Sequence, residues 1–529
     1  MRSSKLIGIF AWLGVAALAF GQNAGSFGPL LTPSTIGIDK WDENCVGIHA
    51  ALFDNGKLII WGYRGVSTNP PAYFTRAYIV NAYTRQFEES IVVPDVHIFC
   101  AGHSHDASGK LVIAGGTEGG TRDHGIARAY IYDPYTKTFT RQDDMVEARY
   151  YPTTFTLADG RVGALSGWRV PEAWSTKIEV FNSQLGTWAS FAATPSTTVP
   201  WYYPFTHTFY DPAAPAGSFN AFIAGQFMQV PNSGGSQRES YVLSITGPTS
   251  GEWIRFGGTF GQLGITSVMM IRSTDPVDRG VVYKFGGLDV QNQNFATNQA
   301  LKFDFEAADP GWESAGTMHH PRTDCTAVLL PDGTVAIVGG SSRVGHPYQQ
   351  REWRVPNVEI FNPATDTFAL SPDWGDESRM YHSLGILLPD RAVLICGGQY
   401  RLPFIDDTFS EISGRLYYPP YYNSLGRPTI VGTATPTMHY YGVTPEEFTF
   451  NVLPGEGNTV DQVTMIRLGA VTHASDMSQR YINLTIKSRT DSTVTVRPPL
   501  NGHIAPPGKY MLFALINGVP SDAHFVTLQ

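Results

Sequence analysis

Three segments of the chain place reactive side chains at the same distance before a tight turn. Cys100, Tyr151 and His382 each lie eight residues before the residue that opens such a turn, and Tyr381 directly precedes His382. A thiol, two phenols and an imidazole suit several metals, but imidazole and phenolate ligands in a tetragonal arrangement favour Cu(II). A bound metal lowers the pKa of a coordinating group, so a tyrosine with an ordinary pKa of about 10 can bind as phenolate. A metal site is expected if the fold brings these segments together.

A second imidazole is available near the C-terminus. His473 lies in VTHASDMSQRYI, a polar stretch that we expect to form a loop between two strands. A Cu(II) site usually has a second imidazole ligand. If this loop reaches the other segments, the metal would hold two domains together.

The elements that carry these residues repeat about every fifty residues. Each unit is an apolar strand, a tight turn, a second apolar strand and a small-residue pair, as in DASGKLVIAGG and LLPDGTVAIVGG. The closing glycines of seven units are 51 to 62 residues apart, which suits one four-stranded blade each. Asn-Gly and Asp-Gly supply the positive φ angles of two-residue hairpins. The fold predicted is all-β: a seven-bladed β-propeller whose innermost strands bring the three segments to one end of the axis. The seven closing glycines are Gly62, Gly116, Gly167, Gly225, Gly287, Gly340 and Gly398.

The repeat ends after Gly398, and the rest of the chain has a different rhythm. Short alternating strands over about 110 residues are typical of an immunoglobulin-like β-sandwich. We therefore expect a signal peptide at 1–21, a propeller at 22–418 and a sandwich at 419–529. The signal peptide is indicated by two early basic residues, an apolar run too short to span a bilayer, and small residues near Gly21. The protein is thus expected to be secreted, with no membrane span.

Composition excludes some function classes. The net charge is −9 and no basic stripe is present, so nucleic acid is not an expected partner. Four cysteines are too few for a disulfide-built scaffold. The pairing of Cys45, Cys325 and Cys396 stays open, and we expect a monomer.

The reactive segments resemble the active-site motifs of the galactose oxidase and glyoxal oxidase family of copper-radical oxidases. These segments are FCAGH, ARYYPT, RMYHS and VTHASDMSQRY, and they occur in the family's order. The propeller part resembles the kelch family, and PGKYMLFALINGVPS resembles the family's C-terminal early-set domain. The resemblance covers nearly the whole mature chain. The residues Tyr-Pro-Thr that follow Tyr150 resemble the glyoxal oxidase branch of the family more closely than the galactose oxidase branch.

The resemblance implies a role for each residue of the motifs. Tyr151 would bind one copper ion and be joined to Cys100 by a thioether, which gives a stabilised radical. His382 and His473 would be the imidazole ligands, and Tyr381 would be the axial phenolate and the general base. The implied reaction is oxidation of a small aldehyde, as its hydrate, or of a primary alcohol, with reduction of O2 to H2O2.

Four further residues are candidates for contact with substrate or for outer-sphere roles: Trp168, Arg169, Trp201 and Tyr202. Trp168 lies close to the place where galactose oxidase has a tryptophan stacked over its thioether, but one position early, so that Arg169 occupies the aligned position. Trp201 and Tyr202 open the fourth blade and are equally compatible with blade packing.

Two other functions fit parts of the same pattern. One is a copper-free kelch propeller that binds glycans or proteins. The other is a redox-inactive metal held by the same ligands. A thioether between Cys100 and Tyr151 separates the oxidase from both.

Overall fold

The computed structural model describes residues 24–32, 35, 46–62, 65–68, 71–93, 97–117, 124–169, 173–175, 177–191, 202–215, 217–225, 240–247, 250–256, 265–288, 295–343, 350–399, 411–432, 434–442, 446–455 and 457–529. The predicted signal peptide, Cys45 and Trp201 lie outside these residues. No helix within the described ranges has the length and apolar character needed to span a membrane.

Seven β-sheets are arranged in a ring, because the short inner strands with which they begin contact one another in succession around a central axis. The inner strands are β2 (His49–Leu52), β7 (Gly102–His105), β11 (Thr153–Thr156), β17 (Phe205–Thr208), β21 (Thr266–Ile271), β25 (Thr326–Leu329) and β29 (Ser383–Leu387). Each is followed by the second strand of its blade, after a short turn in five blades and after a longer loop in blades four and five. The second strands are β3 (Lys57–Trp61), β8 (Leu111–Ala114), β12 (Val162–Leu165), β18 (Phe219–Gly225), β22 (Val281–Phe285), β26 (Val335–Val338) and β30 (Val393–Gly397). The predicted seven-bladed propeller is confirmed.

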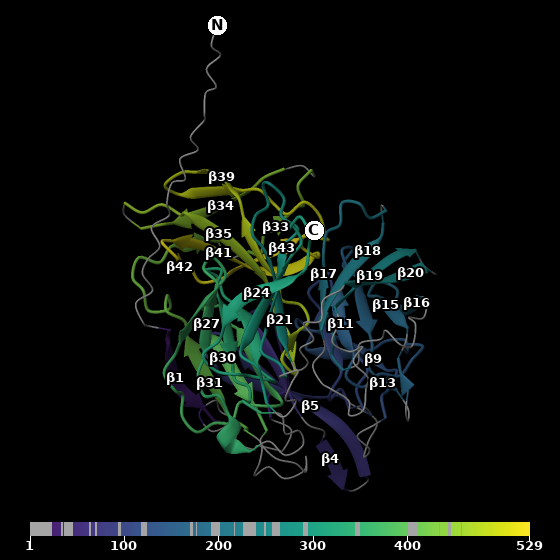
Figure 1. Cartoon of the computed structure of the whole chain (residues 1–529). Helices are drawn as coiled ribbons and strands as arrows, with labels where there is room; N and C mark the ends of the chain where they lie inside the picture. The colour runs from purple at the N-terminus through teal and green to yellow at the C-terminus, as the bar shows by residue number, and fades with distance from the viewer. Residues whose placement is uncertain are drawn as a thin grey trace.

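The outer strands complete the blades as antiparallel neighbours. Blade one adds β5 (Pro71–Asn81), which pairs with β4 (Gly65–Thr68) and β6 (Phe87–Val93). Blade two adds β9 (Ala129–Asp133) and β10 (Thr138–Arg141), blade three β15 (Ile178–Asn182) and β16 (Thr187–Phe191), and blade four β19 (Ser240–Gly247) and β20 (Ser250–Phe256). Blade five adds β23 (Gln299–Asp304) and β24 (Trp312–Thr317), and blade six adds β27 (Glu359–Asn362) and β28 (Thr367–Leu370). Blade seven adds β31 (Gly414–Tyr418) and, from the other end of the chain, β1 (Ser26–Leu31). Figure 1 shows β1 in purple beside the green strand β31, so the first described strand closes the ring.

The C-terminal part forms two further sheets above the propeller (Figure 1). One contains β32 (Thr429–Val431), β34 (Phe448–Leu453), β40 (Thr493–Val496) and β39 (Ile486–Arg489). The other contains β38 (Tyr481–Leu484), β35 (Gln462–Arg467), β41 (Gly508–Ile516), β43 (His524–Leu528) and β33 (Thr437–Met438), with β42 (Val519–Pro520) beside β41. Because β38 pairs in parallel with β21, the second sheet is continuous with blade five.

A hairpin of the C-terminal part extends into the propeller. It consists of β36 (Ala470–Thr472) and β37 (Ser475–Asp476). β36 pairs with the inner strand β2 of blade one and also contacts β7 and β29, whereas β37 contacts β21 and β25. The axis of the propeller is therefore filled by a segment that follows strand β2 by more than 400 residues and begins about fifty residues after the last blade ends.

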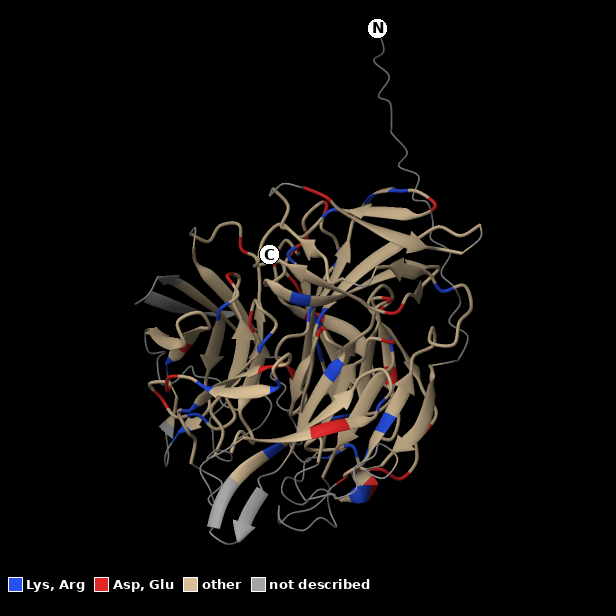
Figure 2. Cartoon of the chain, turned by 180° about the vertical axis from the view of Figure 1, so that it is seen from behind, with Lys and Arg blue, Asp and Glu red and all other residues tan. Residues whose placement is uncertain are grey.

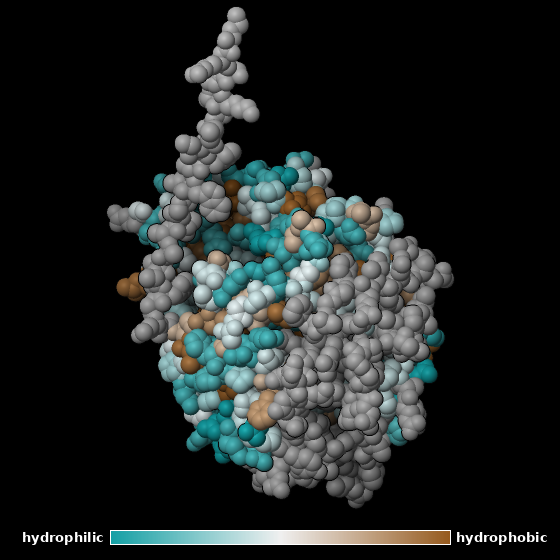
Figure 3. Space-filling model, in the orientation of Figure 1, coloured by the Kyte–Doolittle hydropathy of each residue, from teal (hydrophilic) through white to brown (hydrophobic). Residues whose placement is uncertain are grey.

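Acidic and basic residues are interspersed along the described part of the chain, and hydrophilic and hydrophobic residues are mixed on its surface. Figure 2 shows Lys and Arg interspersed with Asp and Glu along the ribbon, and Figure 3 shows hydrophilic and hydrophobic residues intermingled on the described part of one face. This distribution agrees with the absence of a basic stripe in the sequence.

Buried arginines fix the starts of the inner strands. Arg149, two residues before Tyr151, donates to the carbonyl oxygens of Ser166 at 2.6 Å and Lys177 at 2.9 Å. Its guanidinium also pairs with Glu179 at 2.9 Å, and neither side chain of the pair is exposed. Because an unpaired buried charge is costly, this pair holds the segment before Tyr151 in place.

Blade six contains the same arrangement. Arg322 donates to the carbonyl oxygens of Gly339 and Asn357, both at 2.8 Å, and pairs with Glu359 at 3.0 Å. Both side chains are again fully buried. The two Arg–Glu pairs can therefore be compared directly. The pair in blade three lies beside the ligand candidate Tyr151, whereas the equivalent segment of blade six contains no ligand candidate.

We expect Glu179→Gln and Glu359→Gln each to lower the free energy of unfolding by about 3 kcal/mol, because each leaves a guanidinium buried without its carboxylate. Urea unfolding followed by fluorescence measures this effect. Only Glu179→Gln should also weaken copper binding, since only Arg149 precedes a ligand candidate. Equal copper affinities for the two variants would contradict the positioning role assigned to Arg149.

Candidate metal centre

The starts of the inner strands have an unusual backbone conformation. Cys100, Tyr151, Asp324 and His382 have φ angles of 59°, 62°, 59° and 65°, and each lies sixteen residues before the second closing glycine of its blade. Tyr203 opens blade four with a φ of 41°. The left-handed region costs a non-glycine residue of order 1 kcal/mol and persists where the surroundings impose it, often at functional sites. The strained residues therefore occupy equivalent positions, at the starts of the inner strands of several blades.

Backbone hydrogen bonds join neighbouring blades at this level. The amide of Tyr151 donates to the carbonyl oxygen of Cys100 at 3.0 Å, and the amide of Tyr203 donates to that of Tyr151 at 3.0 Å. The amide of Cys100 donates to Nε2 of His49 at 3.0 Å. These bonds fix the separation of the Cys100 and Tyr151 main chains without depending on a metal.

Five side chains from three blades and the inserted hairpin meet at the axis. Sγ of Cys100 lies 3.7 Å from Nε2 of His473, and the hydroxyls of Tyr151 and Tyr381 lie 2.5 Å apart. One ligand atom from each of Cys100, His382 and His473 falls within 4.8 Å of the others. All five side chains are buried, with at most 4% of the residue surface exposed. We call this group the axial cluster.

Ring contacts make the axial cluster compact. The Tyr381 and His382 rings are stacked with centroids 3.8 Å apart, and the rings of His382 and His473 are 4.6 Å apart at nearly a right angle. The Tyr151 ring lies 4.9 Å from that of His473. Two imidazoles, two phenols and one thiol within this space fit a copper site.

His473 occupies the tip of the β36–β37 hairpin. Thr472 pairs with Ser475, and the two residues between them, His473 and Ala474, have φ angles of 46° and 65°. A two-residue turn with two positive φ angles normally contains Asn or Gly. Here the contacts of the hairpin with the propeller hold non-glycine residues in that conformation. The sequence predicted a polar loop at this place, and the structure shows a tight turn.

Polar neighbours orient the two imidazoles. Nδ1 of His382 lies 3.1 Å from Oε1 of Gln399, an oxygen that only accepts, so Nδ1 carries the proton and Nε2 keeps its lone pair. Nδ1 of His473 lies 2.6 Å from the Thr472 hydroxyl, which can accept in the same way. Such partners commonly fix the tautomer of a metal-binding histidine. Both imidazoles can therefore direct Nε2 towards the other members of the cluster.

Burial favours the neutral forms of Tyr151 and Cys100 in the axial cluster. Desolvation, followed by the neighbouring Cys100, Tyr150 and Tyr381 side chains, raises the pKa of Tyr151 well above its usual value. Desolvation also raises the pKa of the Cys100 thiol. A divalent cation reverses this effect for a coordinating group, because its charge stabilises the anion inside the protein. The cluster is thus suited to gain phenolate character when a metal binds.

Two buried histidines near the inserted hairpin give stability a pH dependence. Burial and the nearby Arg480 lower the pKa of His207 to about 3, and burial followed by Arg467 and His103 lowers the pKa of His105 to about 3. In the unfolded chain these imidazoles have a pKa of about 6.5. Below that pH the unfolded state binds protons that the folded state does not, so stability falls as the pH decreases from about 6.5 towards 3.

The free energy of unfolding of the wild type should fall between pH 6.5 and pH 5. We expect this fall to be about 2 kcal/mol smaller in His207→Gln, which lacks the imidazole. Chemical unfolding at the two pH values measures this difference, and carboxyl groups that titrate equally in both proteins cancel. Parallel pH profiles would show that His207 is not held neutral in the folded protein.

Of the four further candidates, Tyr202 contacts the axial cluster, and Trp168 and Arg169 lie in a neighbouring hairpin. The Tyr202 ring is 5.0 Å from that of Tyr151. Trp168 belongs to β13 (Trp168–Arg169), which pairs with β14 (Ala173–Trp174), and its ring lies 4.7 Å from that of Trp174. Arg169 pairs with Glu147 at 2.9 Å. The stacking of Trp168 over a thioether stays a prediction.

Sequence reasoning did not select several residues of this region. Tyr150 is in edge-to-face contact with Tyr151 at 4.3 Å. Gln399 and His49 contact members of the cluster, as described above. The only available signal was position, because Gln399 directly follows the closing glycines and Tyr150 directly precedes Tyr151.

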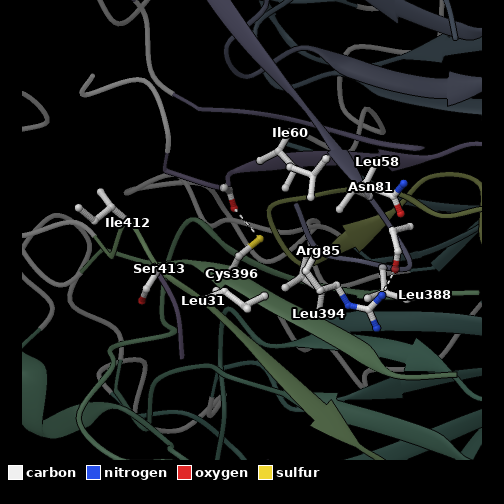
Figure 4. A pocket seen from close by; sticks show the side chains of 14 residues that line it. Leu31, Leu58, Ile60, Asn81, Arg85, Leu388, Leu394, Cys396, Ile412 and Ser413 are labelled. Carbon is white, nitrogen blue, oxygen red and sulfur yellow. Dashed lines mark hydrogen bonds between the residues drawn. The ribbon is translucent and has the colours of Figure 1, made fainter. Parts of the chain in front are cut away.

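An apolar cavity of about 60 Å3 lies apart from the axial cluster, between blades one and seven (Figure 4). Cys396 lines it beside Leu58, Ile60 and Leu394, and its Sγ lies 3.9 Å from the carbonyl oxygen of Gly47. Burial raises the pKa of this thiol to about 12. Cys325, like Cys396, is a buried free cysteine among the described residues. The possible pairing of Cys45 is not described.

Comparison with known proteins agrees with this geometry. Residues 427–528 match the family described as the galactose oxidase-like early set domain. A galactose oxidase of Gibberella zeae is 27% identical over 456 residues, which cover 82% of this chain and 61% of that enzyme. The chain is therefore similar to a galactose oxidase over most of its length. It spans about three fifths of the length of that relative.

The chain also matches parts of plant aldehyde oxidases. One from Arabidopsis thaliana is 28% identical over 253 residues, covering 44% of this chain and 40% of that protein. One from Vitis pseudoreticulata is 30% identical over 233 residues, covering 41% of this chain and 43% of that protein. A solved structure of a fungal AA5-family alcohol oxidase in complex with copper matches 96% of this chain and 100% of that chain, with a TM-score of 0.77 and 21% identity. The predicted fold class and family resemblance are confirmed.

Proposed function

We propose that the chain is a copper-radical oxidase that oxidises a small aldehyde, as its hydrate, or a primary alcohol, and reduces O2 to H2O2. The observation that carries the proposal is the axial cluster, in which Cys100, Tyr151, Tyr381, His382 and His473 meet in a buried space. The relatives named galactose oxidase and aldehyde oxidase support this class of reaction.

The proposed copper ligands are Tyr151, Tyr381, His382 and His473, and Cys100 would be joined to Tyr151 by a thioether. The bound metal would supply one-electron redox chemistry at this centre. The backbone bond between Cys100 and Tyr151 holds their side chains on neighbouring strands at the same level. Gln399 and the Thr472 hydroxyl would hold the two imidazole tautomers that leave Nε2 available.

The cluster also supplies the proton and hydrogen transfers that the reaction needs. The Tyr381 oxygen would take the hydroxyl proton of the substrate as a general base. Tyr151, once oxidised, would take a hydrogen atom from the substrate carbon. Loss of this proton and hydrogen atom, together with one further electron that the bound metal would accept, converts a primary alcohol to an aldehyde, or an aldehyde hydrate to a carboxylic acid. O2 would then take up the two electrons and two protons as H2O2. Burial keeps bulk water away from the oxidised side chain.

We further propose a secreted protein with a signal peptide at 1–21, a propeller that ends near residue 418 and a sandwich at 419–529. The end of β31 at Tyr418 and the start of β32 at Thr429 support this boundary. Among substrates we favour small aldehydes over alcohols and sugars, because Tyr-Pro-Thr after Tyr150 resembles the glyoxal oxidase branch.

A peroxide-coupled assay tests the proposed reaction. Copper-loaded protein is mixed with panels of small aldehydes, primary alcohols and sugars in air, and H2O2 and the oxidised product are quantified together. We expect one equivalent of each per turnover, with the highest kcat/KM for an aldehyde. Absence of peroxide with every panel in folded, copper-loaded protein would contradict the proposal and favour a binding propeller.

A further inference from the structure

Four aromatic rings form a continuous series that leads from the axial cluster towards the surface. The centroid of Tyr151 lies 5.0 Å from that of Tyr202, which lies 4.8 Å from Trp174, which lies 4.7 Å from Trp168. All three contacts are edge-to-face, with interplanar angles of 63°, 74° and 77°. Tyr151 is 4% exposed, whereas the other three side chains are partly exposed. The series therefore connects a buried ring with solvent.

The outer part of the series is held rigidly. Trp168 and Trp174 pair with each other in the β13–β14 hairpin. Reciprocal backbone hydrogen bonds of 2.7 Å join Trp168 to Tyr150, the residue next to Tyr151. Glu147 anchors the hairpin by accepting from Arg169 at 2.9 Å and from the Ser175 hydroxyl at 2.5 Å. The ring separations are thus fixed by the fold.

The chemical composition of the series differs from that of the aromatic cluster between blades four and five. There Phe222, Phe303 and Phe305 pack together with centroid distances of 4.7 to 5.3 Å, and Trp312 lies at their edge. The series at Tyr151 contains only tyrosine and tryptophan, the two aromatic side chains most readily oxidised by one electron. Packing alone would be satisfied by phenylalanine, and the partial exposure of Trp168 and Trp174 gives them little core to fill.

We propose that Tyr202, Trp174 and Trp168 form an aromatic relay through which a one-electron oxidant at the surface oxidises Tyr151. This inference rests on the proposed function, because it requires Tyr151 to be the redox-active tyrosine. The partner is a one-electron oxidant too large to reach a side chain that is 4% exposed.

Electrons and protons balance in this transfer. The external oxidant gains one electron from the relay, and the relay regains it from Tyr151, so that Tyr202, Trp174 and Trp168 end unchanged. Tyr151 loses one electron and, if it is still protonated, its hydroxyl proton passes to the Tyr381 oxygen 2.5 Å away. The net result is one oxidised Tyr151 for each oxidant molecule reduced.

Ferricyanide, an anionic one-electron oxidant, provides the test. Copper-loaded protein is first reduced to the state without a tyrosyl radical and then mixed with ferricyanide, and the radical is followed by absorbance and quantified by electron paramagnetic resonance. We expect Trp174→Phe to slow radical formation at least tenfold and Trp174→Tyr, which restores an oxidisable ring, to recover most of the rate. The matched control is Trp188→Phe in the same blade, which should keep the wild-type rate.

The outcomes separate this inference from the proposed function. If the wild type forms no radical, the proposed function fails and the relay fails with it. If the wild type forms the radical and Trp174→Phe forms it equally fast, the relay is overturned and the oxidase is retained. If Trp174→Phe changes only the KM for substrate, the aromatic series is part of the substrate surface and the relay is likewise overturned.

Discussion

Replacing Cys100 by serine should lower turnover by on the order of 10³-fold or more, the scale expected when one member of a cooperating catalytic group is removed. Copper should still bind with an affinity within about threefold of the wild type, because the proposed ligands are the two tyrosines and two histidines. The physical reason is that serine cannot form the thioether that spreads and stabilises the radical of Tyr151. Steady-state peroxide production and copper titration measure the two effects separately.

Cys396→Ser is the matched control, because it exchanges the same atoms at another buried cysteine. Cys396 lies against the apolar cavity between blades one and seven and is not part of the axial cluster (Figure 4). Its replacement should leave kcat/KM and the radical signal unchanged. Near-normal turnover by Cys100→Ser would contradict the proposed thioether, even if copper binding were unaffected.

Replacing His473 by alanine should weaken copper binding by on the order of 100-fold or more, since loss of a ligand should exceed the 10–100-fold effect of losing an outer partner. His473 is also the proposed ligand that belongs to the inserted hairpin rather than to a blade. Copper should therefore stabilise the association of the C-terminal part with the propeller, by mass action on the folded state.

Differential scanning calorimetry with and without copper measures this coupling. We expect copper to raise the Tm of the wild type and of a His439→Ala control, which changes a half-buried histidine of the C-terminal part. The increase should be largely absent in His473→Ala. An undiminished copper-dependent increase would show that the metal does not bind through the hairpin.

Much of the propeller could be predicted because its signals are local. Turns such as Asp-Gly and the closing glycine pairs lie within a few residues of the strands they connect, and the left-handed φ of Gly116, Gly340 and Gly398 shows why glycine is required there. The equal distance of Cys100, Tyr151 and His382 from the following turns is local as well. It predicted the common level at which the structure places them.

The remaining features depend on contacts between distant parts of the chain. The pairing of β1 with β31 and of β36 with β2 joins segments that are hundreds of residues apart, and no periodicity in the sequence specifies it. The turn at His473 could not be recognised, because two non-glycine residues adopt positive φ only under the contacts of the propeller. Gln399 carries no motif, and its contact with His382 follows from the blade geometry alone.

Peptide mass spectrometry before and after aerobic copper loading shows whether the proposed thioether forms. We expect the peptides containing Cys100 and Tyr151 to become joined with the loss of two hydrogen atoms, and Cys100→Ser to prevent the linkage. If these peptides remain separate in folded, copper-loaded protein, the axial cluster is a metal site without the proposed radical cofactor.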